Sequence, residues 1–411
     1  MRILLVHQYF LEQNDPGGSR FNEMTKQWAE MGHEITVLAG MVNGATGLKN
    51  AKYKRKIFYQ ENIYHNIKVI RSYTSGAYNI NFIGRLWGYF SYMVSSIFAG
   101  LIYTKGKYDV VLVTSPPLFV GISGFLLAKI KRAPFVFEIR DLWPESAIDT
   151  GVLTNRFIIN LSYKVESLLY RKAQLINVLT PAFKTVLLEK KQVLMKKIVY
   201  LPNASDFTLS DDLLNNFDGI LFRKELGLEN KFIITYVGAH GVANHLIQLI
   251  DTADIFRNSN VHFLLIGDGM KKQELVEEVN LRKLKNVTFL DPVPKKAIFK
   301  YIIASDVGVS ILKKADTFKT IYSNKTFDYM ACKKPVLMVI DGVSRELVET
   351  AKCGVYAEPE NIVDICRAIE VLKEQSNLIQ MGENGYLYAK ENFDRKKIGS
   401  RYIDILDQIN A

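Results

Sequence analysis

Short apolar stretches rich in valine, isoleucine and leucine alternate along the chain with longer stretches of helical periodicity. An apolar run of this kind is typical of a strand buried on both faces, and its alternation with helices predicts β-α units with parallel sheets. We expect two series of strands. The first comprises residues 2–7, 34–39, 68–72, 109–114, 135–139, 175–179 and 198–202, and the second comprises residues 232–237, 261–266, 286–290, 306–310 and 335–339.

A turn-rich segment, 201–206, separates the two series. We therefore expect an α/β protein with two Rossmann-like, doubly wound domains over residues 1–204 and 205–385. The chain ends in a long, charged helical stretch over 376–409, of which residues 386–411 would form a C-terminal helix that could pack back on the first domain. Ligands of such sheets bind beyond the carboxyl ends of the strands, at the topological switch point. Two such domains facing each other would enclose a central cleft.

The size and composition of the chain indicate a folded protein of more than one domain. A chain of 411 residues is longer than a single domain usually is. Hydrophobic residues make up 48% of it and charged residues 23%, which leaves ample apolar surface to bury. A net charge of +11 and a pI near 9.2 favour an anionic partner, which could be a nucleic acid, a membrane surface or a phosphorylated substrate. Because no zinc-ligand spacing or aromatic RNA-binding signature accompanies the basic residues, we expect no nucleic acid partner.

The cysteines and the N-terminus favour a cytoplasmic location. Cys332, Cys353 and Cys366 are an odd number in a long chain, which does not indicate a disulfide framework. The chain begins with a strand-like segment, 2–7, and soon reaches Glu12, so it lacks the apolar region of a signal peptide.

Residues 87–103 form a run of seventeen uncharged residues that is followed by Lys105 and Lys107. The run is shorter than the roughly 20 apolar residues of a transmembrane helix, and it contains three serines and three tyrosines. A buried helix, or a helix that lies in the bilayer interface, fits this composition better than a span. We expect peripheral association with the inner face of the cytoplasmic membrane, where an exposed aromatic and basic helix would account for the positive charge.

The loop after the first strand contains Tyr9 and a glycine pair. Gly17, Gly18 and Ser19 precede an amphipathic helix, and backbone amides at such a helix start can approach an anion. A plain tight turn explains the glycines equally well. The dinucleotide fingerprint G-x-G-x-x-G is absent from this loop, which removes the main support for a nicotinamide or flavin enzyme.

The seven residues 140–146, after the strand at 135–139, combine two carboxylates, an arginine, a tryptophan and a proline. Arg140 could bind phosphate or hold Asp141 in place, and Asp141 or Glu145 could receive or orient an acceptor hydroxyl. Trp143 offers an apolar face to a sugar or a lipid. The alternative is a structural ion pair between Arg140 and Asp141 beside a packed tryptophan.

Loops with candidate donor-binding residues follow the first three strands of the second series. These residues are His240, Asn244, Gly267, Gly269, Lys271 and Val293. The polar side chains could contact a diphosphate, and the glycines allow a ligand to come close to the backbone. The third loop could present backbone groups to a base ring.

Residues 322–339 place small polar groups, a lysine and a carboxylate at a helix start before a buried strand. Ser323, Asn324 and the free amides behind them can face a diphosphate, and Lys325 adds a full charge. Asp328, about one turn further on, could accept hydrogen bonds from ribose hydroxyls. Taken alone, the pattern also fits an ordinary capped helix that leads into a core strand.

Taken together, these segments resemble family 4 of the retaining glycosyltransferases, whose members have the two-domain GT-B fold. The resemblance covers nearly the whole chain. Three segments are also similar to the subgroup of bacterial O-antigen and capsule enzymes that transfer L-fucosamine. These segments are Thr114-Ser115-Pro116-Pro117-Leu118-Phe119, Arg140-Asp141-Leu142-Trp143-Pro144-Glu145-Ser146 and Gly238-Ala239-His240-Gly241.

The resemblance implies a UDP-sugar held mostly by the C-terminal domain and an acceptor on the N-terminal domain, where Tyr9 and Trp143 are the candidates. It implies no cofactor and no metal, and the lack of a convincing Asp-x-Asp signature agrees. Helix dipoles and basic side chains would stabilise the leaving diphosphate.

The chain departs from the family pattern at three places. Thr320 and Asp328 stand where the family often has two glutamates, so the first carboxylate is missing and the second is shorter. His240 and Asn244 replace an arginine and a lysine that many members use, which leaves Lys325, and with it Lys271, to supply more of the positive charge. The segment 113–115 lacks the histidine common near this strand, so we assign no catalytic histidine.

We therefore predict a metal-independent, hexosyltransferase-type glycosyltransferase. It would move a sugar, N-acetyl-L-fucosamine or a related N-acetylated deoxyhexosamine, from UDP to a polyprenyl-diphosphate-linked acceptor in O-antigen or capsule biosynthesis. One alternative is a UDP-sugar epimerase of the same fold, which needs no lipid acceptor. Another is a non-catalytic scaffold that binds nucleotide at the membrane.

Overall fold

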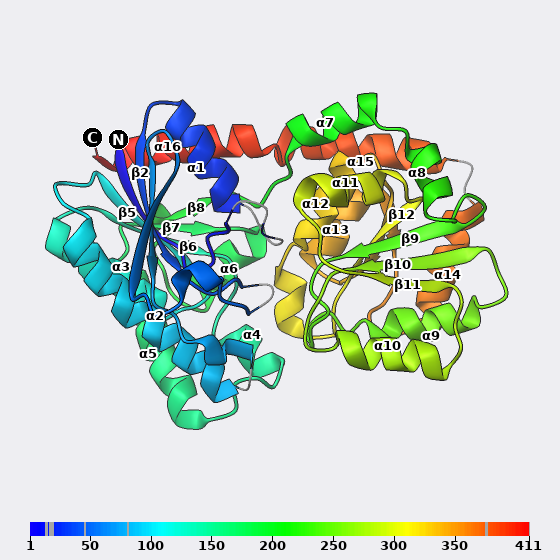
Figure 1. The fold of residues 1–411 in the computed structure, drawn as a ribbon, viewed down its shortest axis with the longest axis horizontal. Coiled ribbons are helices and arrows are strands. Elements are labelled where there is room, and N and C mark those ends of the chain that lie inside the picture. The colour runs from blue at the N-terminus through cyan, green and yellow to red at the C-terminus, as the bar shows by residue number, and fades with distance from the viewer. Residues whose placement is uncertain (13–14, 16–19, 45–46, 80–81, 375–376, 411) are drawn as a thin grey trace. The chain divides into compact units, whose positions relative to one another are not determined.

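The computed structural model describes residues 1–12, 15, 20–44, 47–79, 82–374 and 377–410, and the chain forms two compact units (Figure 1). The first unit contains residues 1–202 and 396–411, and the second contains residues 203–395. Each unit has one mainly parallel sheet covered by helices. The predicted α/β class with two Rossmann-like halves is confirmed.

The first unit is built on an eight-stranded sheet in the order β3-β4-β2-β1-β5-β6-β7-β8. Every neighbouring pair is parallel except β3 with β4. The strands are β1 Arg2–Val6, β2 Glu34–Gly40, β3 Phe58–Tyr64, β4 Ile67–Ser72, β5 Val110–Ser115, β6 Phe135–Ile139, β7 Leu175–Val178 and β8 Ile198–Tyr200. The switch point lies between β1 and β5, because the strand order runs in opposite directions from this pair.

The edge strand β3 is missing from the sequence prediction. Its residues alternate between half-buried and exposed, so the strand contains no continuous apolar run. It pairs antiparallel with β4 through a tight turn at Asn66, which has a φ of 67°. Asparagine tolerates this left-handed conformation better than most residues.

Helices cover both faces of the first sheet. They are α1 Arg20–Glu30, α2 Phe82–Tyr103, α3 Val120–Lys131, α4 Glu145–Asp149, α5 Arg156–Lys172, α6 Pro181–Glu189 and α16 Arg395–Asn410, with short 3₁₀ helices at Ala51–Tyr53, Gly76–Asn79 and Met195–Lys197. Helices α2, α3 and α5 are neighbours in one layer (Figure 1). The C-terminal helix α16 packs on α1, since the Trp28 indole donates to the Gly399 carbonyl at 2.9 Å and meets the Tyr402 ring edge-on.

The second unit contains a fully parallel six-stranded sheet in the order β11-β10-β9-β12-β13-β14. The strands are β9 Phe232–Val237, β10 Val261–Ile266, β11 Val287–Leu290, β12 Val307–Ile311, β13 Val336–Val339 and β14 Gly354–Tyr356. The sequence prediction omits β14, which has only three residues, all half-buried. The switch point lies between β9 and β12.

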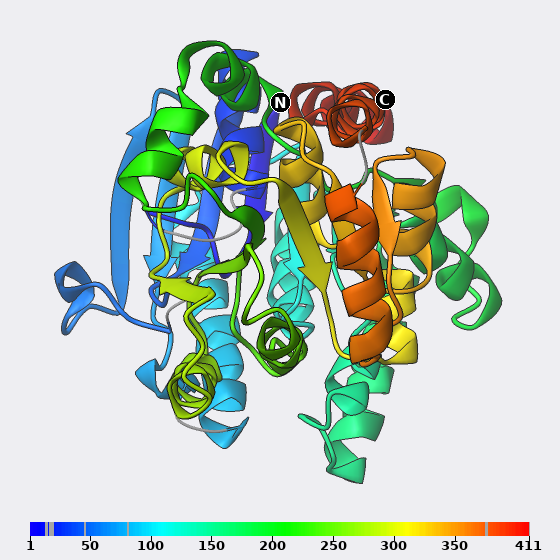
Figure 2. The ribbon, with the colours of Figure 1, turned by 90° about the vertical axis from the view of Figure 1, so that its right-hand side faces the viewer.

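Nine helices belong to the described part of the second unit. They are α7 Phe207–Asn216, α8 Gly219–Glu225, α9 Ile247–Ile255, α10 Lys272–Leu281, α11 Lys295–Ile303, α12 Asn324–Ala331, α13 Val343–Thr350, α14 Ile362–Glu374 and α15 Leu378–Asn392, with a 3₁₀ helix at Asp316–Thr320. Helix α14 packs beside α9 on one face of the sheet, and α11, α12 and α13 lie on the other face (Figures 1 and 2).

The long helical stretch predicted over 376–409 is in fact two helices, α15 and α16. The helix is interrupted at Phe393 and Asp394. There the backbone pairs with Ser205 and does not continue into another helical turn. The Ser205 amide donates to the Phe393 carbonyl, and the Arg395 amide donates to the Ser205 carbonyl, both at 3.1 Å. A helix cannot continue where its amides are bonded to another segment.

A buried ion pair lies among the strands of the first unit. Arg20, the first residue of α1, forms two hydrogen bonds to the Glu138 carboxylate on β6, at 3.1 and 3.2 Å. Asn177 on β7 donates to the same carboxylate at 2.9 Å. Arg20 also donates to the carbonyls of Leu201 and Pro202, directly after β8. The network ties α1, two central strands and the chain's exit from this unit together.

The fold prediction concerns the removal of one partner from this pair. Glu138→Ala should destabilise the first unit by about 3–5 kcal/mol, because it leaves a buried guanidinium without its counter-charge. All three tryptophans, Trp28, Trp87 and Trp143, lie in the first unit, so tryptophan fluorescence during urea unfolding reports on that unit.

The double variant Arg20→Met/Glu138→Leu should recover part of the loss, because no unpaired charge remains buried. The matched control, Glu34→Ala, breaks the solvent-exposed pair with Arg2 and should cost no more than about 1 kcal/mol. Equal effects of Glu138→Ala and Glu34→Ala would show that the buried pair does not hold the unit together.

Candidate functional site

Two glycine loops pack against each other at the carboxyl edge of the second sheet. The His240 amide, after β9, donates to the Asp268 carbonyl at 2.8 Å, and the Lys271 amide donates back to the His240 carbonyl at 2.9 Å. A Cβ atom on Gly267 would lie 1.8 Å from the Gly238 carbonyl oxygen, so a side chain at this position has no room. The two loops therefore come this close together only because Gly267 and Gly269 carry no side chain between them.

His240 lies beneath this surface. Its imidazole is fully buried between the rings of Tyr236 and Phe289, each at a centroid distance of 5.9 Å. Neither ring nitrogen has a hydrogen-bond partner among the residues that the structure describes. Burial, followed by the charge of Lys272, lowers the pKa of His240 to about 4. The side chain is thus neutral near pH 7, and it does not replace the positive charge of an arginine.

The other residues predicted in these loops have separate environments. Asn244 lies in the loop after β9, where its backbone amide donates to the Gly241 carbonyl at 3.3 Å. Lys271 is partly exposed, and its ammonium group pairs with Glu274 at 2.5 Å in the first turn of α10. Val293 is half-buried in the loop between β11 and α11. The charge of Lys271 is thus directed to a neighbouring carboxylate.

Lys325 connects the start of α12 with the β9 loop. Its ammonium group lies 4.9 Å above the centroid of the Tyr236 ring and donates to the Ser323 hydroxyl at 3.3 Å. A Cβ atom on Gly238 would lie 3.3 Å from the Lys325 Cε. Burial lowers the pKa of Lys325 to about 8. Ser323 at the N-cap accepts from the Thr326 amide through its carbonyl at 3.0 Å, but its side chain caps none of the first amides of α12.

Two residues of the turn-rich segment 203–206 contact the same helix. The Ser205 hydroxyl donates to the Asp328 carboxylate at 2.6 Å, and the Asn203 amide hydrogen-bonds the Asn324 side chain. The sequence alone identifies this segment only as a connection between domains. Nothing in its local pattern indicates contacts with residues more than 120 positions away, so only the structure reveals the roles of Asn203 and Ser205.

His7 and Thr114 meet at the switch point of the first sheet. His7 directly follows β1 and Thr114 is the last but one residue of β5, and the His7 Nδ1 lies 2.6 Å from the Thr114 hydroxyl. Burial, with the charges of Arg140 and Arg71, holds the pKa of His7 well below its usual range. The imidazole is neutral, and the Arg140 charge lies close enough to act on it. The sequence prediction assigned His7 no role.

Asp141 and Trp143 follow β6 at the same edge. The Asp141 carboxylate accepts a hydrogen bond from the Ser146 hydroxyl at 2.7 Å, and burial raises the pKa of Asp141 against the effect of this bond. The Trp143 ring lies edge-on to Phe119 at 5.8 Å. A partly desolvated carboxyl is suited to orient a sugar hydroxyl, and an aromatic ring two residues further along the chain can offer an apolar face to a sugar.

Glu145 points to a different set of residues. Lys191 bridges the carboxylates of Glu145 and Glu166, the latter at 2.7 Å, and Glu166 accepts from the Tyr170 hydroxyl at 2.9 Å. This chain joins α4 to α5 and to the end of α6. Glu145 therefore takes part in a contact between helices, whereas Asp141 is held separately by Ser146.

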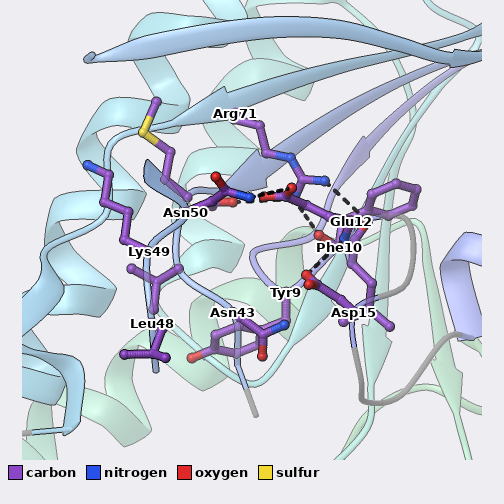
Figure 3. A pocket seen from close by; sticks show the side chains of 13 residues that line it. Tyr9, Phe10, Glu12, Asp15, Asn43, Leu48, Lys49, Asn50 and Arg71 are labelled. Carbon is purple, nitrogen blue, oxygen red and sulfur yellow. Dashed lines mark hydrogen bonds between the residues drawn. The ribbon is translucent and has the colours of Figure 1, made fainter. Parts of the chain in front are cut away.

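Tyr9 lines a cavity of about 310 Å³ in the first unit (Figure 3). The cavity lies at the carboxyl ends of β1, β2 and β4, and its wall mixes polar side chains such as Glu12 and Arg71 with apolar ones such as Phe10 and Leu48. Arg71 and Glu12 in this wall are engaged, the former with Phe10 and Leu11 carbonyls and the latter with Lys52 and Tyr53. The predicted residues Gly17, Gly18 and Ser19 lie outside the described residues.

Across the described residues, no group of three histidine, cysteine, aspartate or glutamate side chains is placed to hold a metal ion.

Solved structures with the same architecture are glycosyltransferases. The sucrose-phosphate synthase of Thermosynechococcus elongatus superposes with a TM-score of 0.74 at 15% identity, over 99% of this chain and 98% of its own. Anabaena HepE, solved in complex with UDP-glucose, superposes with a TM-score of 0.71 at 17% identity, over 99% of this chain and all of its own. At these identities the similarity establishes the fold.

Comparisons of sequence assign the family. Residues 17–204 match the model of the glycosyl transferase 4-like domain, and residues 231–375 match the model of the glycosyl transferases group 1. Escherichia coli K12 contains a relative, named as the colanic acid biosynthesis glycosyl transferase WcaI, that is 22% identical over 323 residues, or 76% of this chain and 77% of its own. The chain therefore belongs to the glycosyltransferases of GT-B fold, with a glycosyl transferase 4-like domain followed by a group 1 domain.

Proposed function

We propose that the chain transfers a sugar from a UDP-sugar, bound by the second unit, to an acceptor bound by the first unit. The observation that carries this proposal is the position of Lys325, which joins the start of α12 to the glycine loop after β9, at the switch point of the second sheet. The HepE structure supports the choice of donor, since a protein of the same fold binds UDP-glucose.

The donor would be held mainly by backbone amides and one cation. The uncapped amides of α12 and the amides after Gly238 and Gly267 would bind the diphosphate, as helix starts and glycine loops do for anions. Lys325 would add the charge that stabilises the leaving UDP. Asp328 would accept from the ribose hydroxyls in competition with Ser205, and the backbone near Val293 would contact the base.

The acceptor would be positioned by the first unit. In a retaining transfer, the bond between the sugar and the diphosphate breaks as the acceptor oxygen bonds to the sugar on the same face, and a phosphate oxygen takes the acceptor proton. The work of the protein is then positioning and charge stabilisation. Asp141 would orient the acceptor hydroxyl, Trp143 and Tyr9 would contact the acceptor, and Arg140 would attract its phosphate.

The proposed substrate class rests on the family resemblance and on the name of one relative. We propose an N-acetylated deoxyhexosamine as the sugar and a polyprenyl-diphosphate-linked saccharide at the inner face of the cytoplasmic membrane as the acceptor, without a metal requirement. The name of WcaI, which refers to colanic acid biosynthesis, supports a role in making a bacterial surface polysaccharide such as O-antigen or capsule.

The first prediction concerns the pH dependence of donor binding. Because burial lowers the pKa of Lys325 to about 8, the free protein loses this charge as the pH rises through 8. UDP affinity should therefore fall by about tenfold between pH 7 and pH 9, since only the protonated form contributes to anion binding. Lys325→Met should weaken UDP binding roughly 10- to 100-fold at pH 7 and remove this pH dependence. Isothermal titration calorimetry measures both.

Lys285→Met is the matched control. Lys285 is an exposed lysine just before β11, at the amino ends of the strands, whereas the candidate donor site lies at their carboxyl ends. It should leave both the affinity and its pH dependence unchanged. If Lys325→Met binds UDP as tightly as the wild type, Lys325 does not contribute to the donor site.

The second prediction separates donor binding from transfer. Asp141→Asn should lower kcat for transfer by about 100-fold or more, because a neutral amide orients the acceptor hydroxyl less well than a carboxylate does. The rise in melting temperature caused by UDP-sugar should be unchanged, since a ligand that binds only the native state stabilises it regardless of turnover. Transfer is measured with UDP-N-acetylhexosamines and a synthetic polyprenyl-diphosphate-linked sugar.

Glu34→Gln alters an exposed carboxylate of the same unit and serves as the control that should keep full activity. If the protein epimerises the sugar of a UDP-sugar in the absence of acceptor, its function is epimerisation and not transfer. Full complementation in cells by Asp141→Asn would instead support a non-catalytic scaffold.

A further inference from the structure

A continuous apolar stripe runs along the solvent side of α2. Its members are Trp87, Val94, Phe98, Leu101 and Ile102, which are 59%, 47%, 54%, 46% and 50% exposed. At about 100° per residue, all five fall within an arc of roughly 100° on the helix surface. Singly exposed apolar residues are ordinary, but five on one helical face form a patch. We call this patch the α2 stripe.

The opposite face of α2 is firmly held by the first unit. The Tyr92 hydroxyl donates to the Leu38 carbonyl of β2 at 2.7 Å, and Ser96 and Ala99 are fully buried. Gly100 is packed against Leu127 of α3. The exposed stripe therefore belongs to a well-seated helix.

Among the described residues, α2 is also the one helix that is long and apolar enough to cross a membrane, over Leu86–Tyr103. However, 39% of this window is buried in the unit, and the buried side contacts β2 and β4. A bilayer-spanning position would require the helix to leave these contacts. An orientation with only the stripe in lipid retains all of them.

Positive charge adjoins the stripe at the ends of α2 and α3. Lys105, Lys107, Lys129 and Arg132 are exposed, and Lys131 joins the two helix ends by donating to the Thr104 carbonyl. Residues 82–108 and 116–133 contain no aspartate or glutamate. This basic rim is complementary to an anionic surface. Helices α3 and α5 of the same layer add the exposed apolar residues Ile130 and Phe157.

We propose that the α2 stripe docks on an anionic lipid bilayer, with α2 lying in the plane of the interface and the basic rim on lipid headgroups. This inference deepens the membrane location proposed above by naming the surface and the lipid charge. Apolar side chains that enter the acyl boundary and lysines that meet anionic headgroups both contribute to such binding, and an indole such as Trp87 favours the interface.

Flotation of the full-length chain with vesicles tests the proposal. The wild type should bind vesicles of phosphatidylglycerol and phosphatidylcholine at low salt, and bind far less at about 0.5 M salt or on phosphatidylcholine alone, because salt screens the headgroup charge. The triple variant Trp87→Ser/Phe98→Ser/Leu101→Ser should reduce binding about tenfold or more. Lys105→Glu/Lys107→Glu should reduce it to a similar extent at low salt.

The matched control is Ile220→Ser/Val363→Ser/Ile379→Ser, which removes three apolar side chains of the second unit that are even more exposed than the stripe residues, and it should leave vesicle binding unchanged. Every variant should keep the thermal stabilisation by UDP, so a loss of lipid binding is distinguishable from a misfolded chain and from failure of the proposed transferase function.

Two results would overturn the proposal. One is a wild-type chain that does not float with anionic vesicles at low salt, or a stripe variant that floats as well as the control variant. The other is a stripe variant that changes the chain from dimer to monomer in light scattering while vesicle binding is unaffected. That outcome would assign the stripe to a second copy of the chain.

Discussion

The buried pair between Arg20 and Glu138 is the constraint around which the first unit is arranged. Two charges removed from water are tolerated only when their hydrogen-bonding groups are satisfied, and here Asn177 and the carbonyls of Leu201 and Pro202 complete the set. The pair therefore fixes the start of α1 relative to β6 and β7, and it fixes the point at which the chain leaves the unit. Asp141 and Trp143 follow Glu138 by only a few residues, so their position depends on the same strand.

A second constraint, the absence of side chains, shapes the second unit. Gly238, Gly267 and Gly269 allow the loops after β9 and β10 to touch, and the resulting backbone surface lies next to a partly desolvated lysine. A cation that has lost part of its hydration to burial against Tyr236 gains most from an anion that restores the lost interactions. This explains how the site could bind a diphosphate although His240, buried and neutral, does not supply a charge in that loop.

The two candidate sites differ in how their carboxylates are used. Asp141 is held by one hydroxyl donor, from Ser146, whereas Glu145 is engaged by the ammonium group of Lys191 in a chain of side chains between helices. Neighbouring acidic residues in a seven-residue segment thus have different environments, one suited to contact a substrate hydroxyl and the other to join structural elements. Similarly, Asp328 shares its carboxylate with Ser205, so a ribose at this position would compete with a contact that already orders the chain.

The amino-acid sequence by itself determined the α/β class, the two parallel sheets and the loops that carry the candidate residues, because buried parallel strands require continuous apolar runs and the loops between them concentrate glycine and polar groups. It did not indicate β3 or β14, whose residues are only partly buried and leave no apolar run. Only the tertiary structure decided which polar residues meet. The partners of Arg20, Asn203, Ser205 and Glu145 lie 118, 121, 123 and 46 residues away in the chain, and no local periodicity encodes a contact at such separations. Tertiary packing also decided that α2 buries one face and exposes the other, since large apolar residues occur on both faces and only the position of the sheet distinguishes them.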